Sequence, residues 1–277
     1  MTFFFPSPSV YVRYPSQRRV PLIISSPHSG RIYFSDFVEN SRVSFGDLQR
    51  VEDRYIDLFF DEESSYGATF LSTDFPRSWC DVNRDYRELD PNMFRPALDY
   101  EDILISEKVK NGFGVIPRCI SQGKSIYTHC LPQDEINFRL SIGWFPYHER
   151  LNNLIRQLYN TFGKVFIIDF HSMPPLLFNK KTDFVLGNNH GKSCSSDFVS
   201  FIENFLLKNK YQVKINTPYS GGYITKKYGN PDNNIHVIQI EIDRSLYINL
   251  STLKLSSNFI FLKKQINNLI KEIVDFI

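Results

Sequence analysis

Cysteine is scarce in this chain of 277 residues, and long apolar runs are missing. The few cysteines are far apart and form no C-x-x-C pair, which argues against a zinc ribbon and a dense disulfide framework. No apolar stretch approaches the roughly 20 residues that cross a bilayer. The N-terminal Phe run is interrupted by prolines before a signal-peptide core could form. These absences predict reduced thiols and a cytoplasmic protein without membrane contact.

Blocks of like charge are also missing. Lys and Arg number 32 against 30 Asp and Glu, so the formal net charge is only +2, and no run reaches the five or six like charges of a nucleic-acid-binding arm. We therefore expect no nucleic-acid partner. There is no internal repeat and no low-complexity linker, and 42% of the residues are hydrophobic. Together these features predict a single domain over residues 1–277 with one large core.

Three short segments have the pattern of strands. The apolar runs 20–26 and 164–169 suit strands that are buried on both faces. In 236–243, isoleucines alternate with Val237, Gln239, Glu241 and Asp243, so one face belongs to the core and the other carries polar groups. Polar residues at the ends of such strands are held by a fixed backbone and are therefore good candidates for a site.

Three longer segments have the pattern of amphipathic helices, and they cover residues 134–163, 195–209 and 255–277. Gly163 is expected as a C-terminal cap of the first helix, and Ser195 or Ser196 as the N-cap of the second. Strands that alternate with helices predict a layered α/β fold with a largely parallel or mixed sheet, whose active site lies at strand ends.

Two histidines follow predicted strands. His28 stands in "SPHSG", and His is the commonest neutral metal ligand, although a hydrogen-bonded structural histidine is the more frequent case. In "IIDFHSM", alternation turns Asp169 and His171 to the same face, so that the carboxylate could orient the imidazole of a metal ligand. A buried Asp–His pair that stabilises a turn is an equal alternative.

Charged residues gather in two further segments. In "FPRSWCDVNRDYRELDP", an Asn–Arg fork could hold a substrate carboxylate with bidentate bonds, while a solvated ion-pair loop is the alternative. Glu241 lies on the polar face of "IQIEIDR", where partial burial would suit a general base; pairing with Arg244 or another cation is the alternative. Two His ligands, a carboxylate ligand and a nearby Glu together match a catalytic zinc site.

The acidic ligand has more than one candidate in "QRVEDRYIDLFF". This segment offers Glu52, Asp53 and Asp57, and if it is a helix, Asp53 and Asp57 share a face.

At this point the residues resemble the N-formylglutamate amidohydrolase family. The resemblance extends in order from about residue 20 to residue 250 through "SPHSG", "EDRYIDLFF", "PRSWCDVNRD", "GFGVIPR", "PYHERL", "IDFHSMP", "NTPYSGGYI" and "IQIEIDR". It implies a zinc-dependent hydrolase with a three-layer α/β/α fold and a central mixed, mostly parallel sheet, related to zinc carboxypeptidases and aspartoacylases. The implied reaction converts N-formyl-L-glutamate to L-glutamate and formate.

The resemblance also implies roles for single residues. His28, Asp53 and His171 correspond to the ligands of one zinc ion per chain, although another divalent metal would suit the same donors. Zinc carboxypeptidases take His and Glu from one H-x-x-E motif, but here Arg31 stands at the Glu position, so the acidic ligand comes from elsewhere. Asp169 then becomes a residue that orients His171.

For the chemistry and the substrate, the resemblance implies the remaining site residues. Glu241 corresponds to the general base, and Arg77 to an Arg that polarises the scissile carbonyl. The substrate's carboxylate would be bound by Asn83 and Arg84, and Arg244 is a further candidate for substrate binding. Gly221 and Gly222 could form a pliable loop over a small ligand, to which Tyr223 could donate a hydrogen bond; a simple turn is an equal alternative. Two alternatives stay open at this point: cleavage of another N-acyl amino acid or short peptide, and a non-catalytic relative that binds such ligands.

Overall fold

The computed structural model describes residues 9–16, 18–61, 66–98, 101, 103–120, 123–176 and 181–277. The strands are β1 (Val10–Arg13), β2 (Leu22–Ser26), β3 (Thr69–Thr73), β4 (Phe94–Arg95), β5 (Leu131–Pro132), β6 (Val165–Met173), β7 (Phe184–Gly187), β8 (Val213–Ile215) and β9 (Ile235–Asp243). The α-helices are α1 (Ser35–Glu39), α2 (Phe45–Gln49), α3 (Glu107–Lys110), α4 (Asp134–Arg139), α5 (Phe145–Phe162), α6 (Ser196–Lys208), α7 (Tyr223–Tyr228) and α8 (Phe259–Phe276).

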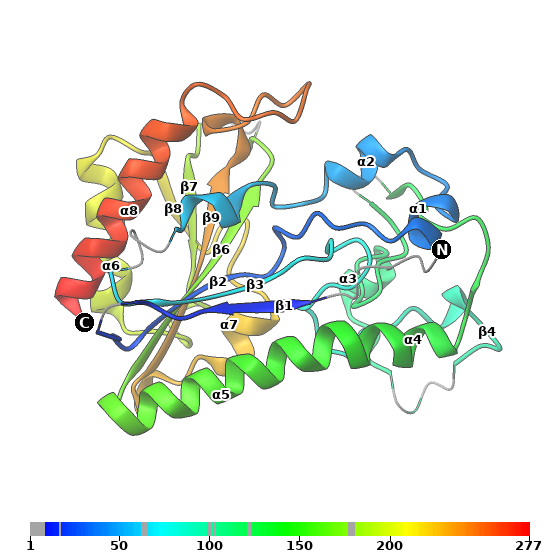
Figure 1. Cartoon of the computed structure of the whole chain (residues 1–277), viewed down its shortest axis with the longest axis horizontal. Coiled ribbons are helices and arrows are strands. Elements are labelled where there is room, and N and C mark those ends of the chain that lie inside the picture. Colours follow the sequence, from blue (N-terminus) through cyan, green and yellow to red (C-terminus); the bar gives the residue numbers. More distant parts are fainter. Residues whose placement is uncertain are drawn as a thin grey trace. The chain divides into compact units, whose positions relative to one another are not determined.

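The chain forms two compact units, and its path crosses between them several times. The loop-rich unit comprises Met1–Tyr11, Pro27–Arg54 and Ser72–Arg150, and the sheet unit comprises Val12–Ser26, Tyr55–Leu71 and Leu151–Ile277. The loop-rich unit contains only short elements in addition to the first turn of α5, whereas most of the sheet and the long helices α6 and α8 belong to the sheet unit. Figure 1 labels the elements of both.

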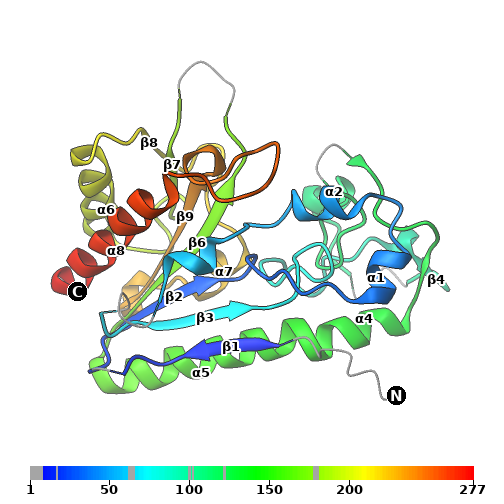
Figure 2. The same cartoon turned by 45° about the horizontal axis from the view of Figure 1, so that its top comes forward.

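The sheet has seven strands in the order β1-β3-β2-β6-β9-β7-β8. β6 pairs in parallel with both β2 and β9, and β7 pairs antiparallel to β9 and parallel to β8. The predicted mixed, mostly parallel sheet is therefore confirmed. Figure 2 shows β2, β6 and β9 side by side, and in the β6–β9 register His171 lies opposite Glu241.

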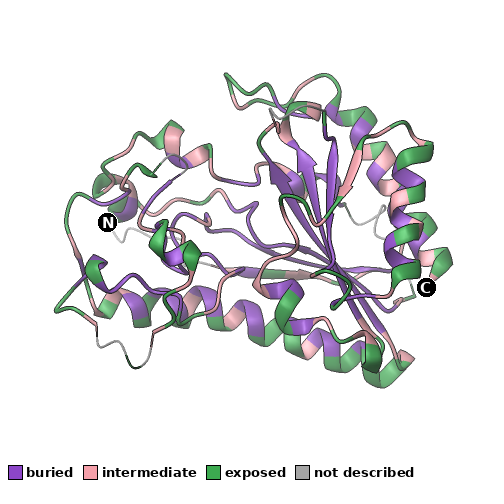
Figure 3. Cartoon of the chain, turned by 180° about the vertical axis from the view of Figure 1, so that it is seen from behind, coloured by how far each residue is buried: buried purple, intermediate pink, exposed green. Residues whose placement is uncertain are grey.

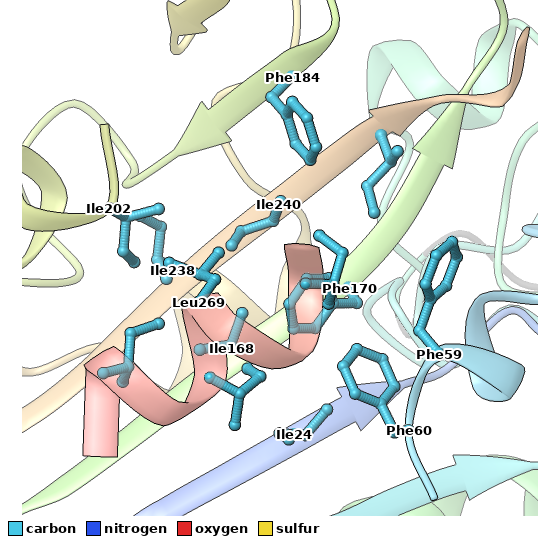
Figure 4. Close-up of a cluster of buried hydrophobic side chains, with 14 of the residues drawn as sticks. Ile24, Phe59, Phe60, Ile168, Phe170, Phe184, Ile202, Ile238, Ile240 and Leu269 are labelled. Atoms are coloured by element: carbon cyan, nitrogen blue, oxygen red, sulfur yellow. The ribbon is translucent and has the colours of Figure 1, made fainter. Parts of the chain in front are cut away.

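The core of the sheet unit lies on one face of this sheet. Ile168 and Phe170 of β6 pack with Ile238 and Ile240 of β9, and α6 and α8 add residues such as Leu269 (Figure 4). Burying one such side chain contributes roughly 1.5–3 kcal/mol. Because neighbouring residues of a strand point to opposite faces, the polar residues between these core positions must point to the other face.

Helices flank both faces of the sheet. α6 and α8 lie side by side and cover the core face (Figure 1), and α8 alternates between buried and exposed residues while the central strands are buried throughout (Figure 3). α7 contacts β9 on the other face, where the Gly222 N–H at its start donates to Gln239 (2.7 Å). The predicted α/β/α layering is confirmed by this arrangement.

The predicted helix over 134–163 is present, with one irregular turn. α4 continues through a π-helical turn, η6 (Leu140–Trp144), directly into α5. The helix ends as expected, because Gly163 adopts φ +70° and its N–H donates to the Tyr159 carbonyl at 2.7 Å. Ser195 is the N-cap of α6, as predicted, and accepts from the Phe198 N–H. Across the residues that the structure describes, we find no helix long and apolar enough to span a bilayer.

Candidate active site

His28 is buried directly after β2 and contacts two carboxylates of the loop-rich unit. Its Nε2 lies 2.7 Å from Asp81 Oδ1, and its Nδ1 lies 3.3 Å from Asp53 Oδ2. An ionised carboxylate only accepts hydrogen bonds, so the contact with Asp81 places the imidazole proton on Nε2. Nδ1 faces the Asp53 carboxylate, which is an acceptor as well, so a lone pair on Nδ1 suits a cation held between these two groups.

Asp81 is the carboxylate that holds this arrangement together. It also accepts from the Asn83 N–H (2.9 Å) and from Arg77 Nη2 (2.9 Å). Burial alone would raise its pKa, but the neighbouring His28, Arg77 and Arg84 hold the pKa of Asp81 well below its ordinary value. Asp81 is therefore ionised at neutral pH. Its role was missed from the sequence, although it stands in the "DVNR" segment that was singled out there.

Glu52 and Asp53, the two candidates for the acidic ligand that precede η1 (Ile56–Phe59), have different hydrogen-bond partners. Glu52 is engaged by other groups, since its Oε1 accepts from the Tyr33 hydroxyl (2.6 Å) and its Oε2 from Arg54 Nη1 (2.7 Å). Asp53 is buried, its N–H donates to the His28 carbonyl, and its carboxylate faces the His28 ring. The segment does not form the α-helix considered above, because Tyr55 has φ +68° and only a 3-10 turn follows.

His171 is held in the sheet unit by its own strand. Its Nε2 lies 2.9 Å from Asp169 Oδ2, and Asp169 Oδ1 accepts from Ser25 Oγ of β2 at 2.6 Å. These three side chains are buried. The same reasoning about the proton places it on Nε2 of His171, so Asp169 orients the imidazole as the sequence predicted.

Glu241 lies beside His171 on the same face of the sheet. The two residues are register partners on β9 and β6, and Glu241 Oε1 accepts from Gln239 Nε2 at 2.8 Å. The Gln239 Oε1 in turn accepts from the N–H of Gly222, the N-cap of α7. Gln239 was not among the predicted site residues, although its place on the polar face of 236–243 was a signal for it.

The predicted substrate-binding residues lie in three places. Tyr223 is the first residue of α7, and Arg244 donates through Nε to Ser172 Oγ (2.9 Å), next to His171. Asn83 is buried in the loop after Asp81. Arg84 follows it, is half-buried, and donates through Nε to the Phe113 carbonyl at 3.0 Å.

Three of the predicted residues form a group that could hold a metal ion. His28, Asp53 and His171 are all buried, and the ligand atoms that they offer lie within 4.8 Å of one another. Two imidazoles and one carboxylate are the donor set of many catalytic zinc sites. Each imidazole also has a carboxylate partner at Nε2, which is the usual second hydrogen bond of a metal-binding histidine. The residues present therefore fit a metal of this kind.

Fold and site together define an α/β protein with a candidate metal centre, and comparison with known proteins identifies its family. The chain belongs to the N-formylglutamate amidohydrolase family, whose model matches residues 20–248. It is similar to the N-formylglutamate deformylases of Pseudomonas putida (28% identical over 239 residues, covering 84% of this chain and 83% of the relative) and Pseudomonas aeruginosa (28% over 237 residues, 83% of each).

Solved structures agree with this assignment. The crystal structure of N-formylglutamate amidohydrolase from Ralstonia eutropha superposes with a TM-score of 0.90 at 29% identity, covering 96% of this chain and 97% of that one. The Atu2144 gene product of Agrobacterium tumefaciens shares the fold, with a TM-score of 0.61 at 14% identity and 96% coverage of each chain. The family and the fold that the sequence predicted are therefore both confirmed.

Proposed function

We propose that this chain hydrolyses the amide bond of N-formyl-L-glutamate and releases L-glutamate and formate. Its family is one of amidohydrolases, and the curated relatives are named N-formylglutamate deformylases. The observation that carries the proposal is the buried group of His28, Asp53 and His171, which offers three converging ligand atoms. The substrate is thus a small molecule.

The metal in this proposal is one divalent ion per chain, with zinc as the first choice. Its ligands would be His28 and His171 through Nδ1, because a carboxylate holds Nε2 of each, together with a carboxylate oxygen of Asp53. Asp53 is preferred to Glu52, whose two oxygens already accept from Tyr33 and Arg54. Such an ion supplies Lewis acidity and makes a water molecule more acidic.

Glu241 is the proposed general base. It is buried, lies beside His171, and is held at one oxygen by Gln239. A carboxylate so placed can take a proton from the attacking water and pass it to the leaving amine of glutamate. The bond from Gln239 restricts the rotation of the Glu241 carboxylate and so helps to orient it for this transfer.

The charged groups around the centre have distinct proposed roles. Arg77 polarises the formyl carbonyl, and its position is set by the bond to Asp81. Asn83 and Arg84 bind a carboxylate of the substrate with charge-assisted hydrogen bonds. Tyr223 and Arg244 complete the substrate contacts.

The test measures metal content and the release of formate from N-formyl-L-glutamate by the purified protein. We expect a stoichiometric divalent metal, loss of activity after treatment with a chelator, and recovery on adding zinc. Glu241→Gln should lower kcat by about 10²–10⁴-fold while metal is retained. Glu272→Gln makes the same change at an exposed position on α8 and is the matched control. Full activity of Glu241→Gln would rule out the proposed mechanism.

The acyl group and the amino acid are tested separately. The site residues define the reaction better than the pocket does, since one methylene changes discrimination by only about 1–3 kcal/mol. A panel of N-formyl-L-glutamate, N-acetyl-L-glutamate, other N-formyl amino acids and short peptides should give the highest kcat/KM for the first. A higher value for another member would assign that substrate class instead.

A further inference from the structure

One motif of the sequence, "PYHERL", is not used by the reaction outlined above, yet its histidine reaches the substrate-binding loop. The motif lies in the first turns of α5, and His148 is buried there. Its Nε2 lies 2.8 Å from the carbonyl oxygen of Val82. A carbonyl can only accept, so His148 donates this bond.

Trp144, one helical turn before His148, contacts the same loop. Its indole Nε1–H donates to the Arg84 carbonyl at 2.9 Å, and the two aromatic rings pack with their centroids 4.0 Å apart. The two donors therefore hold the backbone on either side of Asn83, at Val82 and at Arg84.

The π-helical turn η6 explains how the continuous helix of α4, η6 and α5 contacts three backbone carbonyls of residues 79–84. Arg139, at the end of α4, donates through Nη1 to the Trp79 carbonyl at 3.0 Å. Residues five apart, such as Arg139 and Trp144, lie about 140° apart around a regular α-helix. A π-helical turn pairs residues i and i+5, as Phe145 N–H does with the Leu140 carbonyl, so it brings such residues more nearly onto one face.

Bonds within the loop-rich unit fix part of this loop, since the Asn83 N–H donates to Asp81 and Arg84 Nε donates to the Phe113 carbonyl. Asp81 is anchored by its N–H, which donates to the Val115 carbonyl, and by its carboxylate. The next three residues form a turn, closed by the bond from the Arg84 N–H to the Asp81 carbonyl at 3.2 Å. The bonds from His148 and Trp144 fall within this turn.

We propose that Trp144 and His148 are positioning residues for substrate binding, which fix the backbone around Asn83 so that Asn83 and Arg84 meet the substrate's carboxylate together. This inference rests on the proposed function, since it assumes that Asn83 and Arg84 bind that carboxylate. Both residues act through the backbone of the loop, at the Val82 and Arg84 carbonyls. Their removal should therefore weaken substrate binding more than it slows the chemical step.

The test uses His148→Phe, which keeps a stacked ring but loses the N–H, and Trp144→Phe, which loses the indole N–H. We expect each variant to raise KM for N-formyl-L-glutamate by about tenfold or more, because a buried carbonyl loses its donor, with a smaller change in kcat. The dissociation constant of the product L-glutamate, measured by calorimetry, should rise by the same factor, and metal content should stay at the wild-type value. His148→Gln, whose amide can donate, should recover part of the loss.

The matched control is His236→Phe. His236 is also buried, stacks on Phe166 with ring centroids 4.7 Å apart, and bonds a backbone group, the Ser195 N–H, at 3.1 Å. It should lose stability to a similar degree but keep its KM. If His148→Phe fails to fold, Trp144→Phe carries the test alone.

Two different results separate this inference from the proposed function. Wild-type protein that neither cleaves N-formyl-L-glutamate nor binds L-glutamate overturns the function. Wild-type protein that does both, with His148→Phe and Trp144→Phe matching its KM and its affinity for glutamate, overturns the positioning role alone. An equal rise in KM for His148→Phe and His236→Phe would also overturn it.

Discussion

His28 and His171 each have a carboxylate partner, but the two partners come from different kinds of structure. Both imidazoles are buried and both have Nε2 held by a carboxylate. For His171 the carboxylate is Asp169, two residues earlier on the same strand, whereas for His28 it is Asp81, 53 residues away in a loop. A strand sets the first pair by its geometry alone, and the second pair depends on the folding of the loop-rich unit.

Asp169 and Asp81 also differ in which other groups donate hydrogen bonds to them. Asp169 also accepts from the hydroxyl of Ser25, a residue of the neighbouring strand. Asp81 also accepts from the Asn83 N–H and from Arg77, so it connects the proposed ligand His28 with the proposed substrate-binding residue Asn83 and the proposed electrophile Arg77. We therefore expect changes around His171 to act mainly on the metal, and changes around His28 to act on metal, substrate and stability together.

The largest effect is expected from removing the imidazoles themselves. His28→Ala and His171→Ala should both lose bound metal and reduce kcat/KM by more than the 10–100-fold that is typical of changes to a ligand's hydrogen-bond partner. Metal analysis and formate release measure this, with His236→Ala as a control outside the group. If only one of the two variants loses metal, the two sites are not equivalent, and the three-residue centre is wrong.

The next largest effect compares the carboxylate partners. Asp81→Asn and Asp169→Asn should each weaken metal affinity by roughly 10–100-fold. Asp81→Asn should in addition raise KM and lower the free energy of unfolding by about 1–3 kcal/mol, because Arg77 loses the nearer of its two charged partners. Competition with a metal chelator and urea unfolding provide the measurements. Identical profiles for the two variants would contradict the comparison.

A smaller effect is expected at Ser25, which bonds Asp169 from β2. Ser25→Ala removes one hydrogen bond to a charged group, so it should weaken metal affinity by a few-fold and stability by about 1.5–3 kcal/mol at most. KM should not change, since the Ser25 hydroxyl acts on Asp169 of the sheet unit, whereas Asn83 is held by Asp81. A rise in KM equal to that of Asp81→Asn would show that the two surroundings are coupled.

The smallest effect is the pH dependence of stability that we expect from His236, near the start of β9. Burial, and the positive charge of Lys164, lower the pKa of His236 below its ordinary value of 6.5. Below about pH 6.5 the unfolded chain therefore binds more protons at this residue than the folded chain does, so its contribution to stability falls as pH decreases and is constant above that pH. Urea unfolding of wild type and His236→Gln between pH 5 and 8 should show this slope only in the wild type. Parallel curves would contradict the expected shift.

The parts that the sequence predicted are those that depend on local periodicity. Alternation placed Asp169 and His171 on one face of their strand and Glu241 on the polar face of 236–243, and the register of β6 and β9 then brings His171 opposite Glu241. Capping by Gly163 and Ser195 also followed from local signals. In these cases the residues that decide the structure are neighbours in the chain.

The parts that the sequence did not predict depend on contacts between distant segments. The bond of His28 to Asp81, and those of Trp144 and His148 to the loop before Asp85, join residues more than 50 positions apart. The π-helical turn η6 was also missed, because a helical pattern of period 3.6 does not reveal one extra residue. A single domain over 1–277, a cytoplasmic location and the individual site roles stay predictions.

The two-residue spacing of Asp169 and His171 limits which insertions and deletions β6 can tolerate. Both residues lie on one uninterrupted strand whose opposite face is packed with Ile168 and Phe170. One amino acid inserted or deleted early in β6 would exchange the two faces from that point on, and it would direct His171 towards α6 and α8. Insertions and deletions should therefore be tolerated in loops of the chain but not within β6, where even a change that preserves every side chain would take the proposed ligand His171 out of the site.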